Sequence, residues 1–281
     1  MSAQKAEDTL HYAVAGRSDA AAPVLLSSGL GGLAAYWGPQ RPVLDAAYRV
    51  ITYDQRGTGA NPDNLPQEYG ISDMADDVAA IMADAACGPV HFVGHALGGL
   101  IGLDLALRHP EKLASLVLIN TWAKLDPHTA HCFDVRTAIL RDSGPRAYVA
   151  AQAIFLHPAP YLSGQAERLR REEDAAVVHF QGVETLTRRI AALRAFDIVA
   201  HLPRITMPTL ILAARDDMLV PWTCSQILAD GIPSARLVTF DYGGHANNVT
   251  DPESFNAVLL ASLALIDGTI AVRGEAVVDI G

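Results

Sequence analysis

The chain has 281 residues, of which 50% are hydrophobic and 19% are charged, and its formal net charge at pH 7 is −10. This composition is typical of a folded globular protein and excludes a disordered chain. Because an acidic surface repels phosphate backbones, we expect no nucleic-acid partner.

The cysteine spacing and the lengths of the apolar runs indicate neither a disulfide-bonded or zinc-binding protein nor a membrane protein. Cys87, Cys132 and Cys224 lie far apart, without the spacing of a disulfide framework or a zinc site, so we expect reduced thiols, no metal and no other cofactor. The N-terminal residues are acidic where a signal peptide needs an apolar core. The longest apolar stretch, 257–266, is far shorter than the ~20 residues of a membrane span. These features predict a cytoplasmic protein, a monomer or homodimer, that acts on a small molecule and has no membrane partner.

Short runs rich in β-branched residues alternate with longer helical patterns along most of the chain. Six runs are predicted to be strands: 24–28, 49–54, 90–94, 115–120, 209–214 and 236–241. Apolar residues at helical spacing predict a helix over 72–86 and another from 97 onwards. Since most strand runs are continuously apolar, as in strands covered on both faces, the pattern predicts an α/β fold with a mostly parallel sheet flanked by helices.

This alternation stops after Trp122. From there to Pro203 the sequence is rich in Ala, Arg, Glu and Leu and has helical periodicity without a convincing strand. We expect a helical cap insertion, 122–203, over the carboxyl ends of the strands, in a single domain whose core is 1–121 and 204–281. The alternative is that these helices are further crossovers packed on the sheet. No pattern predicts the structure of the tail, 267–281.

The letters VGHALGG at 93–99 lie between a predicted strand and a predicted helix. Their two spaced glycines match the G-x-S-x-G elbow of hydrolases, in which a sharp turn exposes a serine nucleophile above the sheet. Here the nucleophile position is Ala96. Alanine has neither a lone pair nor an ionisable proton, so a covalent intermediate at this position is excluded.

A glycine-rich stretch, SSGLGG at 27–32, directly follows the first predicted strand. In α/β hydrolases a loop at this place donates one backbone N–H to the oxyanion hole, and the residue after the nucleophile donates the second. By position these donors are Leu30 and Leu97. The alternative is a glycine loop without a catalytic role. Three further residues are candidates for lining the pocket: Ser28, His95 and Trp122.

Two motifs near the C-terminus carry the remaining chemistry. Asp217, in DDMLVP at 216–221, follows a predicted strand and precedes a proline by four residues. His245, in YGGHANN at 242–248, lies in a glycine loop after the last predicted strand. The order elbow, acid, histidine is that of α/β hydrolases, so we expect His245 to be a general base oriented by Asp217. The alternative is that both are ordinary loop residues.

Longer strings make a narrower resemblance. They are SGLGG, YWGPQ, YDQRGTGANPD, VGHALGGLIG, HFQG, DDMLVP and YGGHANNVTDPESFNA. With them the chain resembles the α/β-hydrolase superfamily and, within it, the RutD family of the bacterial pyrimidine-utilisation pathway. The resemblance implies a native alanine at the elbow and a hydrolase acting late in uracil or thymine breakdown. That family is described both as a carbamate hydrolase, for a reaction that also proceeds unaided, and as an aminoacrylate hydrolase.

With alanine at the elbow, hydrolysis can still use water as the nucleophile. With no hydroxyl at Ala96, a water can be deprotonated by His245 while the N–H groups of Leu30 and Leu97 stabilise the oxyanion. We therefore expect a weak hydrolase of C–N bonds that converts carbamate to ammonia and CO₂. Three alternatives remain open: deamination of 3-aminoacrylate, a catalytically silent metabolite-binding protein, and a laboratory Ser-to-Ala trapping variant of a serine esterase.

Overall fold

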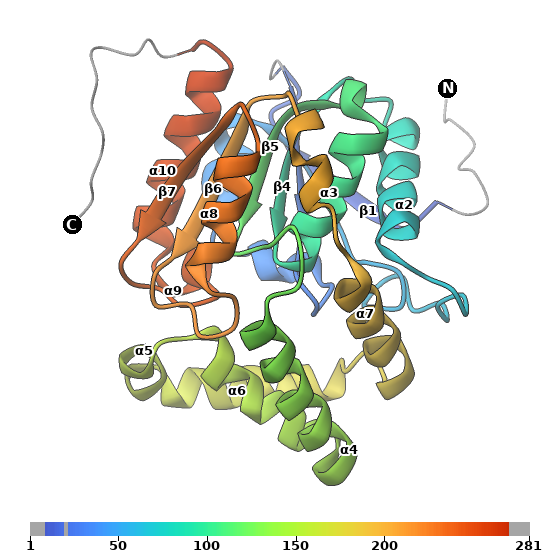
Figure 1. Cartoon of the computed structure of the whole chain (residues 1–281), viewed down its shortest axis with the longest axis vertical. Helices are drawn as coiled ribbons and strands as arrows, with labels where there is room; N and C mark the ends of the chain where they lie inside the picture. The colour runs from blue at the N-terminus through green and yellow to red at the C-terminus, as the bar shows by residue number, and fades with distance from the viewer. Residues whose placement is uncertain (1–8, 20–21, 270–281) are drawn as a thin grey trace.

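The computed structural model describes residues 9–19 and 22–269 (Figure 1). A seven-stranded sheet crosses the molecule in the order β1-β3-β2-β4-β5-β6-β7. Its strands are β1 (Tyr12–Gly16), β2 (Val24–Ser27), β3 (Arg49–Tyr53), β4 (Val90–His95), β5 (Leu113–Ile119), β6 (Thr209–Ala214) and β7 (Ala235–Phe240). β1 runs antiparallel to β3, and every other pair of neighbours is parallel. The mostly parallel sheet predicted from the sequence is thus confirmed. Most of the predicted tail, residues 270–281, lies outside the described residues.

One strand was not predicted. β1 lies at the edge of the sheet, where Tyr12 is half-buried and the next four residues are exposed. An exposed edge strand needs no continuous apolar run, so its sequence, YAVAG, lacks the signal that marks the six buried strands. β5 also begins at Leu113, two residues before the predicted start.

Side chains on alternate sides of the strands divide the core into two apolar layers. In β5, Leu116 and Leu118 pack into one layer, and Val117 and Ile119 into the other. The first layer is covered by α2 (Ile71–Asp84), α3 (Leu97–Arg108) and α8 (Trp222–Gly231), and the second by α1 (Arg41–Ala47) and α10 (Pro252–Ile266). A strand buried on both faces has no polar side to present, which explains the continuous apolar runs.

Four helices between β5 and β6 lie beyond the carboxyl ends of the strands (Figure 1). They are α4 (Pro127–Leu156), α5 (Ala159–Gly164), α6 (Ala166–Val178) and α7 (Val183–Ala195), and together they are called the cap here. α4 is kinked at Gly144, whose φ is 80°, followed by Pro145. Because proline lacks an amide hydrogen and glycine adopts positive φ easily, this pair breaks the helix into two arms. The remaining elements are η1 (Ala34–Trp37), η2 (Pro110–Lys112), η3 (Val199–Arg204) and α9 (Asn247–Thr250).

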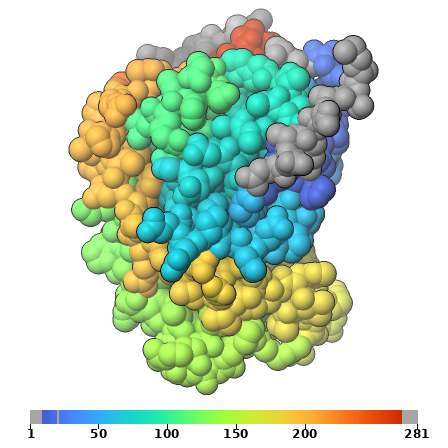
Figure 2. Space-filling view, turned by 90° about the vertical axis from the view of Figure 1, so that its right-hand side faces the viewer, coloured from blue at the N-terminus to red at the C-terminus, as the bar shows by residue number. Residues whose placement is uncertain are grey.

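The cap closes directly on loops of the core. Arg188 of α7 donates to the carbonyl oxygens of Leu65 and Pro66, the latter at 2.9 Å. Figure 2 shows the yellow surface of the cap in contact with the blue and cyan surface of these N-terminal segments. The carboxyl ends of the strands therefore face a covered space. Within residues 9–19 and 22–269, no helix has the length and apolar character needed to cross a membrane.

Candidate active site

The turn at the end of β4 has the backbone of a nucleophile elbow. Ala96 joins β4 to α3 with φ 48° and ψ −111°, a region in which residues other than glycine are strained. Its N–H donates to the carbonyl oxygen of Ile119 (2.9 Å), and its carbonyl oxygen accepts from Thr121 Oγ1 (2.8 Å). The end of β5 and the residues after it therefore hold the turn, with a methyl group where a nucleophile elbow carries its reactive side chain.

Close packing requires both glycines of the motif. A Cβ atom at Gly94 would lie 2.4 Å from the carbonyl oxygen of Gly98, and one at Gly98 would lie 2.1 Å from the carbonyl oxygen of Ser27. Both distances are far shorter than van der Waals contact. The two glycines thus allow β4 to turn sharply into α3 and allow α3 to begin next to the loop after β2.

His245 and Asp217 form a buried pair. His245 Nδ1 lies 2.8 Å from Asp217 Oδ2, and the two side chains are 3% and 0% exposed. The other carboxylate oxygen accepts from the N–H groups of Leu219 (2.8 Å) and Val220 (2.9 Å). Because a carboxylate only accepts, Nδ1 of His245 carries the hydrogen of this bond, and Nε2 is the ring nitrogen left for proton transfer. The pair is thus arranged as a base with an orienting acid.

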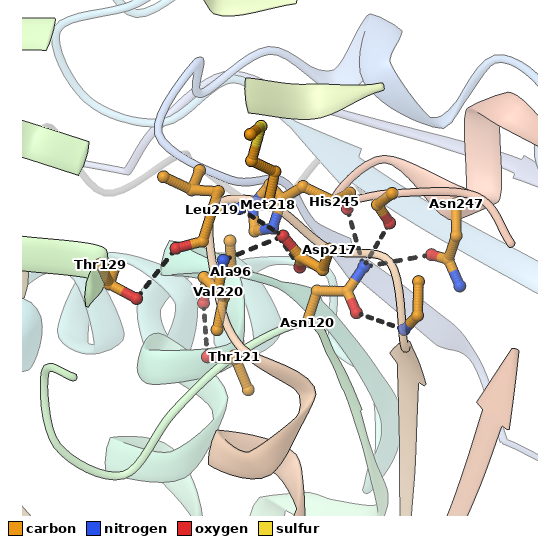
Figure 3. A network of polar contacts seen from close by, with 12 residues as sticks. Ala96, Asn120, Thr121, Thr129, Asp217, Met218, Leu219, Val220, His245 and Asn247 are labelled. Carbon is orange, nitrogen blue, oxygen red and sulfur yellow. Dashed lines mark hydrogen bonds and ion pairs between the residues drawn. The ribbon is translucent and has the colours of Figure 1, made fainter. Parts of the chain in front are cut away.

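Asn120 fixes the loop that carries His245, as Figure 3 shows. Its φ is 46°, a conformation that asparagine tolerates better than most residues. Its Nδ2 donates to the carbonyl oxygen of His245 (2.8 Å), while its Oδ1 accepts from the N–H of Ala214 (3.1 Å). Asn120 therefore ties the histidine loop to the end of β6. This role of Asn120 was not predicted. The available signal was a polar residue at the end of an apolar strand, on the sheet edge that carries the elbow.

The loop after β2 has its carbonyl groups held in place. The carbonyl oxygen of Ser28 accepts from Gln55 Nε2 (2.7 Å), that of Gly29 from the N–H of Gly32 (3.0 Å), and that of Leu30 from Gln181 Nε2 (3.0 Å). Since the C=O and N–H of a trans peptide point in opposite directions, the bond to Gly29 also fixes the N–H of Leu30. The N–H of Leu30 is therefore held in one orientation, as an oxyanion-hole donor requires.

Arg189 of α7 orients both of these glutamines. Its Nη2 donates to Gln55 Oε1 and its Nη1 donates to Gln181 Oε1 (3.2 Å). The side chain is fully buried, and burial lowers the pKa of Arg189 to about 10. With both amide oxygens occupied by the guanidinium, the amide nitrogens of the glutamines are directed to the carbonyls of Ser28 and Leu30. The cap thus supports the loop through one arginine.

A cavity of about 300 Å³ lies between the sheet and the cap. Seven residues that the sequence singled out line it: Ser28, Leu30, His95, Ala96, Leu97, Trp122 and His245. Asp217 does not line the cavity, but it bonds two residues that do, His245 and Leu219. Leu97 begins α3, and its N–H has no partner within the helix, as is usual in the first helical turn. The structure thus brings the candidate base, the elbow and both candidate N–H donors to one space.

Several polar atoms around the cavity are buried without a partner. Among the described residues, Ser28 Oγ, Trp122 Nε1 and His95 Nδ1 have no hydrogen bond. His95 Nε2 lies 2.8 Å from the carbonyl oxygen of His245 and must donate to it, so Nδ1 is an acceptor. Burial, together with repulsion from His245, holds the pKa of His95 well below its usual range. His95 is therefore neutral and keeps an unused acceptor.

Two polar cavity residues from the cap were not predicted. Arg136 and Gln152, both on α4, line the cavity. They belong to no motif, and about 40 residues or more separate them from the elbow, so only the fold brings them to the site. Within the described part of the chain, no group of three or more His, Cys, Asp or Glu side chains is arranged to hold a metal ion.

Comparisons of the sequence find close relatives. A family model of the alpha/beta hydrolase fold matches residues 22–252. A protein of Stutzerimonas stutzeri named "Putative carbamate hydrolase RutD" is 52% identical over 263 residues, which make up 93% of this chain and 99% of that protein. A protein of the same name from Variovorax paradoxus is 55% identical over 258 residues, 92% of this chain and 97% of that protein.

Solved structures share the fold over nearly the whole chain. A hydrolase from Pseudomonas aeruginosa is 32% identical with a TM-score of 0.79, and the match covers 90% of this chain and 93% of that one. The enol-lactonase of Burkholderia xenovorans is 27% identical with a TM-score of 0.81, covering 90% and 96%. The chain therefore belongs to the α/β-hydrolase fold family and, within it, to the RutD proteins.

Proposed function

We propose that this protein hydrolyses carbamate in pyrimidine breakdown, using a water activated by His245 and Asp217. The observation that carries the proposal is a complete base and orienting acid beside an elbow whose residue, Ala96, has no nucleophilic atom. The name of the relatives, which is that of a carbamate hydrolase, supports the substrate. Carbamate decomposes without assistance, so a site without a strong nucleophile is sufficient for it.

The proposed reaction is a single displacement. His245 Nε2 takes a proton from water, and the water oxygen bonds to the carbamate carbon. The N–H groups of Leu30 and Leu97 stabilise the negative oxygen of the tetrahedral intermediate. The C–N bond then breaks as protonated His245 returns the proton to nitrogen, which leaves as ammonia. The other product is bicarbonate, which equilibrates with CO₂, so atoms and charge balance.

Carbamate decay followed by stopped-flow pH measurement tests this mechanism. His245→Ala and Asp217→Asn should each lower the protein-dependent part of the rate about 100-fold or more, because a positioned general base contributes about 10²–10⁴-fold. His131→Ala, at an exposed position of α4, is the matched control. Carbamate should decay in its presence as fast as with the wild type. Equal decay with and without wild-type protein would exclude catalysis, and binding without turnover would favour a metabolite-binding protein.

The size of the cavity favours a second candidate substrate, 3-aminoacrylate. A carbamate ion has four non-hydrogen atoms and fills only a small part of about 300 Å³, given that a water in the liquid takes about 30 Å³. Addition of the same activated water to the enamine carbon of 3-aminoacrylate would release ammonia and 3-oxopropanoate. Carbon-13 NMR separates the two reactions, because labelled bicarbonate forms in one and an aldehyde in the other.

A further inference from the structure

Arg136 is a buried cation on the cap side of the cavity. It lies on the first arm of α4, is 3% exposed, and lines the cavity that also holds Ala96 and His245. Its guanidinium carbon is 5.2 Å from the ring centroid of Phe133, 5.2 Å from that of Tyr148, and 5.7 Å from that of Phe155. Three aromatic rings thus enclose the charged group.

The guanidinium uses little of its hydrogen-bonding capacity. Of its five N–H groups, one donates to Tyr148 Oη (2.9 Å), and the buried Nε has no partner among the described residues. Nor does any Asp or Glu of residues 9–19 and 22–269 form an ion pair with it or line the cavity. Each buried polar group left unpaired costs about 1–3 kcal/mol. Bracing the two arms of α4 explains the bond to Tyr148 but not the unused donors.

The rings alone do not balance the buried charge. Removing an ion from water costs several kcal/mol even after relaxation, whereas one cation–π contact contributes about 0.5–2 kcal/mol. A carboxylate matches the missing partner, because its two oxygens accept two parallel N–H bonds from a planar guanidinium. The feature that the cavity lacks is therefore an anion, and the ligand that supplies it has room beside the elbow.

We propose that Arg136 is the anion-binding residue of this cavity and holds the carboxylate of a small aliphatic carboxylic acid. The rest of that molecule extends toward Ala96 and His245, where the bond to be hydrolysed lies. Only this second statement rests on the proposed function, in its form with 3-aminoacrylate as the substrate, because in carbamate the carboxylate carbon is itself the reacting carbon. The carboxylate subsite itself requires no turnover, and it makes a negative charge remote from the reacting carbon the property by which the site selects its substrate.

Calorimetric titration with an inert isosteric pair tests the subsite. Propanoate carries the charge and propanamide does not, while their sizes and shapes are nearly equal. Wild-type protein should bind propanoate at least about 10-fold more tightly, since hydrogen bonds to charged groups contribute about 1.5–3 kcal/mol. Arg136→Gln should abolish this preference, and Arg136→Lys should reduce it, because an ammonium group cannot form the bidentate pair.

The matched control is Arg146→Gln on the same helix. Arg146 is 69% exposed and pairs with Asp174 at the surface, so its removal changes the net charge equally but leaves the cavity intact. It should keep the wild-type preference for propanoate. Equal binding of both compounds by the wild type, or an unchanged preference in Arg136→Gln, would overturn the proposal.

Two further measurements separate folding and turnover from anion binding. In wild-type protein labelled with nitrogen-15 arginine, saturation with propanoate should shift the Nε–H resonance of Arg136, whereas a purely structural arginine would not respond. An unmoved resonance contradicts the proposal even if Arg136→Gln fails to fold. His245→Ala should lose hydrolysis but retain the preference for propanoate. Binding of propanoate therefore tests the carboxylate subsite independently of the catalytic proposal.

Discussion

Ala96 keeps the backbone of a nucleophile although its side chain is a methyl group. Its φ of 48° and ψ of −111° cost about 1–3 kcal/mol for a residue other than glycine. This strain persists because Thr121 and Ile119 bond its peptide groups and because Gly94 and Gly98, without side chains, let the adjoining segments pack closely around the turn. The elbow is therefore a property of its surroundings rather than of the residue at its apex.

Restoring a hydroxyl should consequently restore covalent chemistry. Ala96→Ser places a hydroxyl on an elbow already formed, so we expect hydrolysis of p-nitrophenyl acetate with an initial burst that reports an acyl-enzyme. Stopped-flow absorbance measures the burst. Ala96→Gly, which has the same turn without a hydroxyl, is the control and should show none. A folded Ala96→Ser without a burst would mean that the base or the N–H donors are misplaced.

Residues of the candidate site could be singled out from the sequence where they lie in one short motif. Asp217 and His245 each follow a strand in a recognisable string, and the structure places them 2.8 Å apart. Arg136 and Asn120 carry no such string, since their importance depends on partners far away in the chain. Gln181 lies within the string HFQG, yet its bond to Leu30 exists only because the cap folds back on the core.

At the scale of elements, the cap and the histidine loop share a joint at the end of α4. The carbonyl oxygen of Leu156 accepts from the N–H of Ala246 (2.9 Å), next to His245. His157 follows, and its Nδ1 lies 2.9 Å from Thr250 Oγ1. Movement of the cap would therefore act on the loop that carries His245. No periodicity in the sequence predicts this joint, because it consists of one hydrogen bond between backbone groups and one contact between side chains.

Acid should weaken the joint. Burial lowers the pKa of His157 from 6.5 to about 4, so the folded protein binds this proton less readily than the unfolded chain. The stability from a neutral His157 is complete above pH 6.5 and is lost as the pH falls toward 4. His157→Gln should remove about 2–3 kcal/mol of this pH dependence. Urea unfolding at pH 7 and pH 4 measures it.

The control for this experiment is His131→Gln, an exposed position of α4. The free energy of unfolding of this variant should depend on pH as in the wild type. Burial also lowers the pKa of His91 and His95, so part of the loss in acid should remain in every protein compared. An equal pH dependence in His157→Gln and the wild type would contradict the role assigned to this joint.

At the scale of the whole molecule, an acidic protein surrounds a cationic cavity. The net charge is −10, whereas Arg136 is the one arginine that lines the cavity, and no lysine, aspartate or glutamate of the described residues joins it there. The anionic substrate proposed above would therefore approach a repelling surface before it reaches an attracting group. The sequence predicted the sheet and its order of motifs, because buried strands have a strong pattern. The sequence did not predict the contrast between an acidic molecule and a cationic cavity, because Arg136 reaches the cavity only when α4 covers the sheet.

Salt should relieve the repulsion. Between 0.01 M and 0.15 M ionic strength the screening length falls from about 30 Å to about 8 Å. Long-range repulsion is then screened, while the buried contact to Arg136 is screened much less. We expect kcat/KM for an anionic substrate to rise about twofold in steady-state assays over this range. The neutral p-nitrophenyl acetate with Ala96→Ser should show no such rise, and a fall with salt for the anion would contradict the argument.

The alanine at the elbow also determines how the protein is found in a cell extract. Fluorophosphonate reagents detect serine hydrolases by reacting with an activated hydroxyl group, and Ala96 has none to offer. A proteome-wide survey with such reagents would pass over this protein at its elbow, however active it is. Its activity must be sought by following small products such as ammonia. Inhibitors must bind by fitting the shape and charge of the cavity, because they cannot form a covalent bond to position 96.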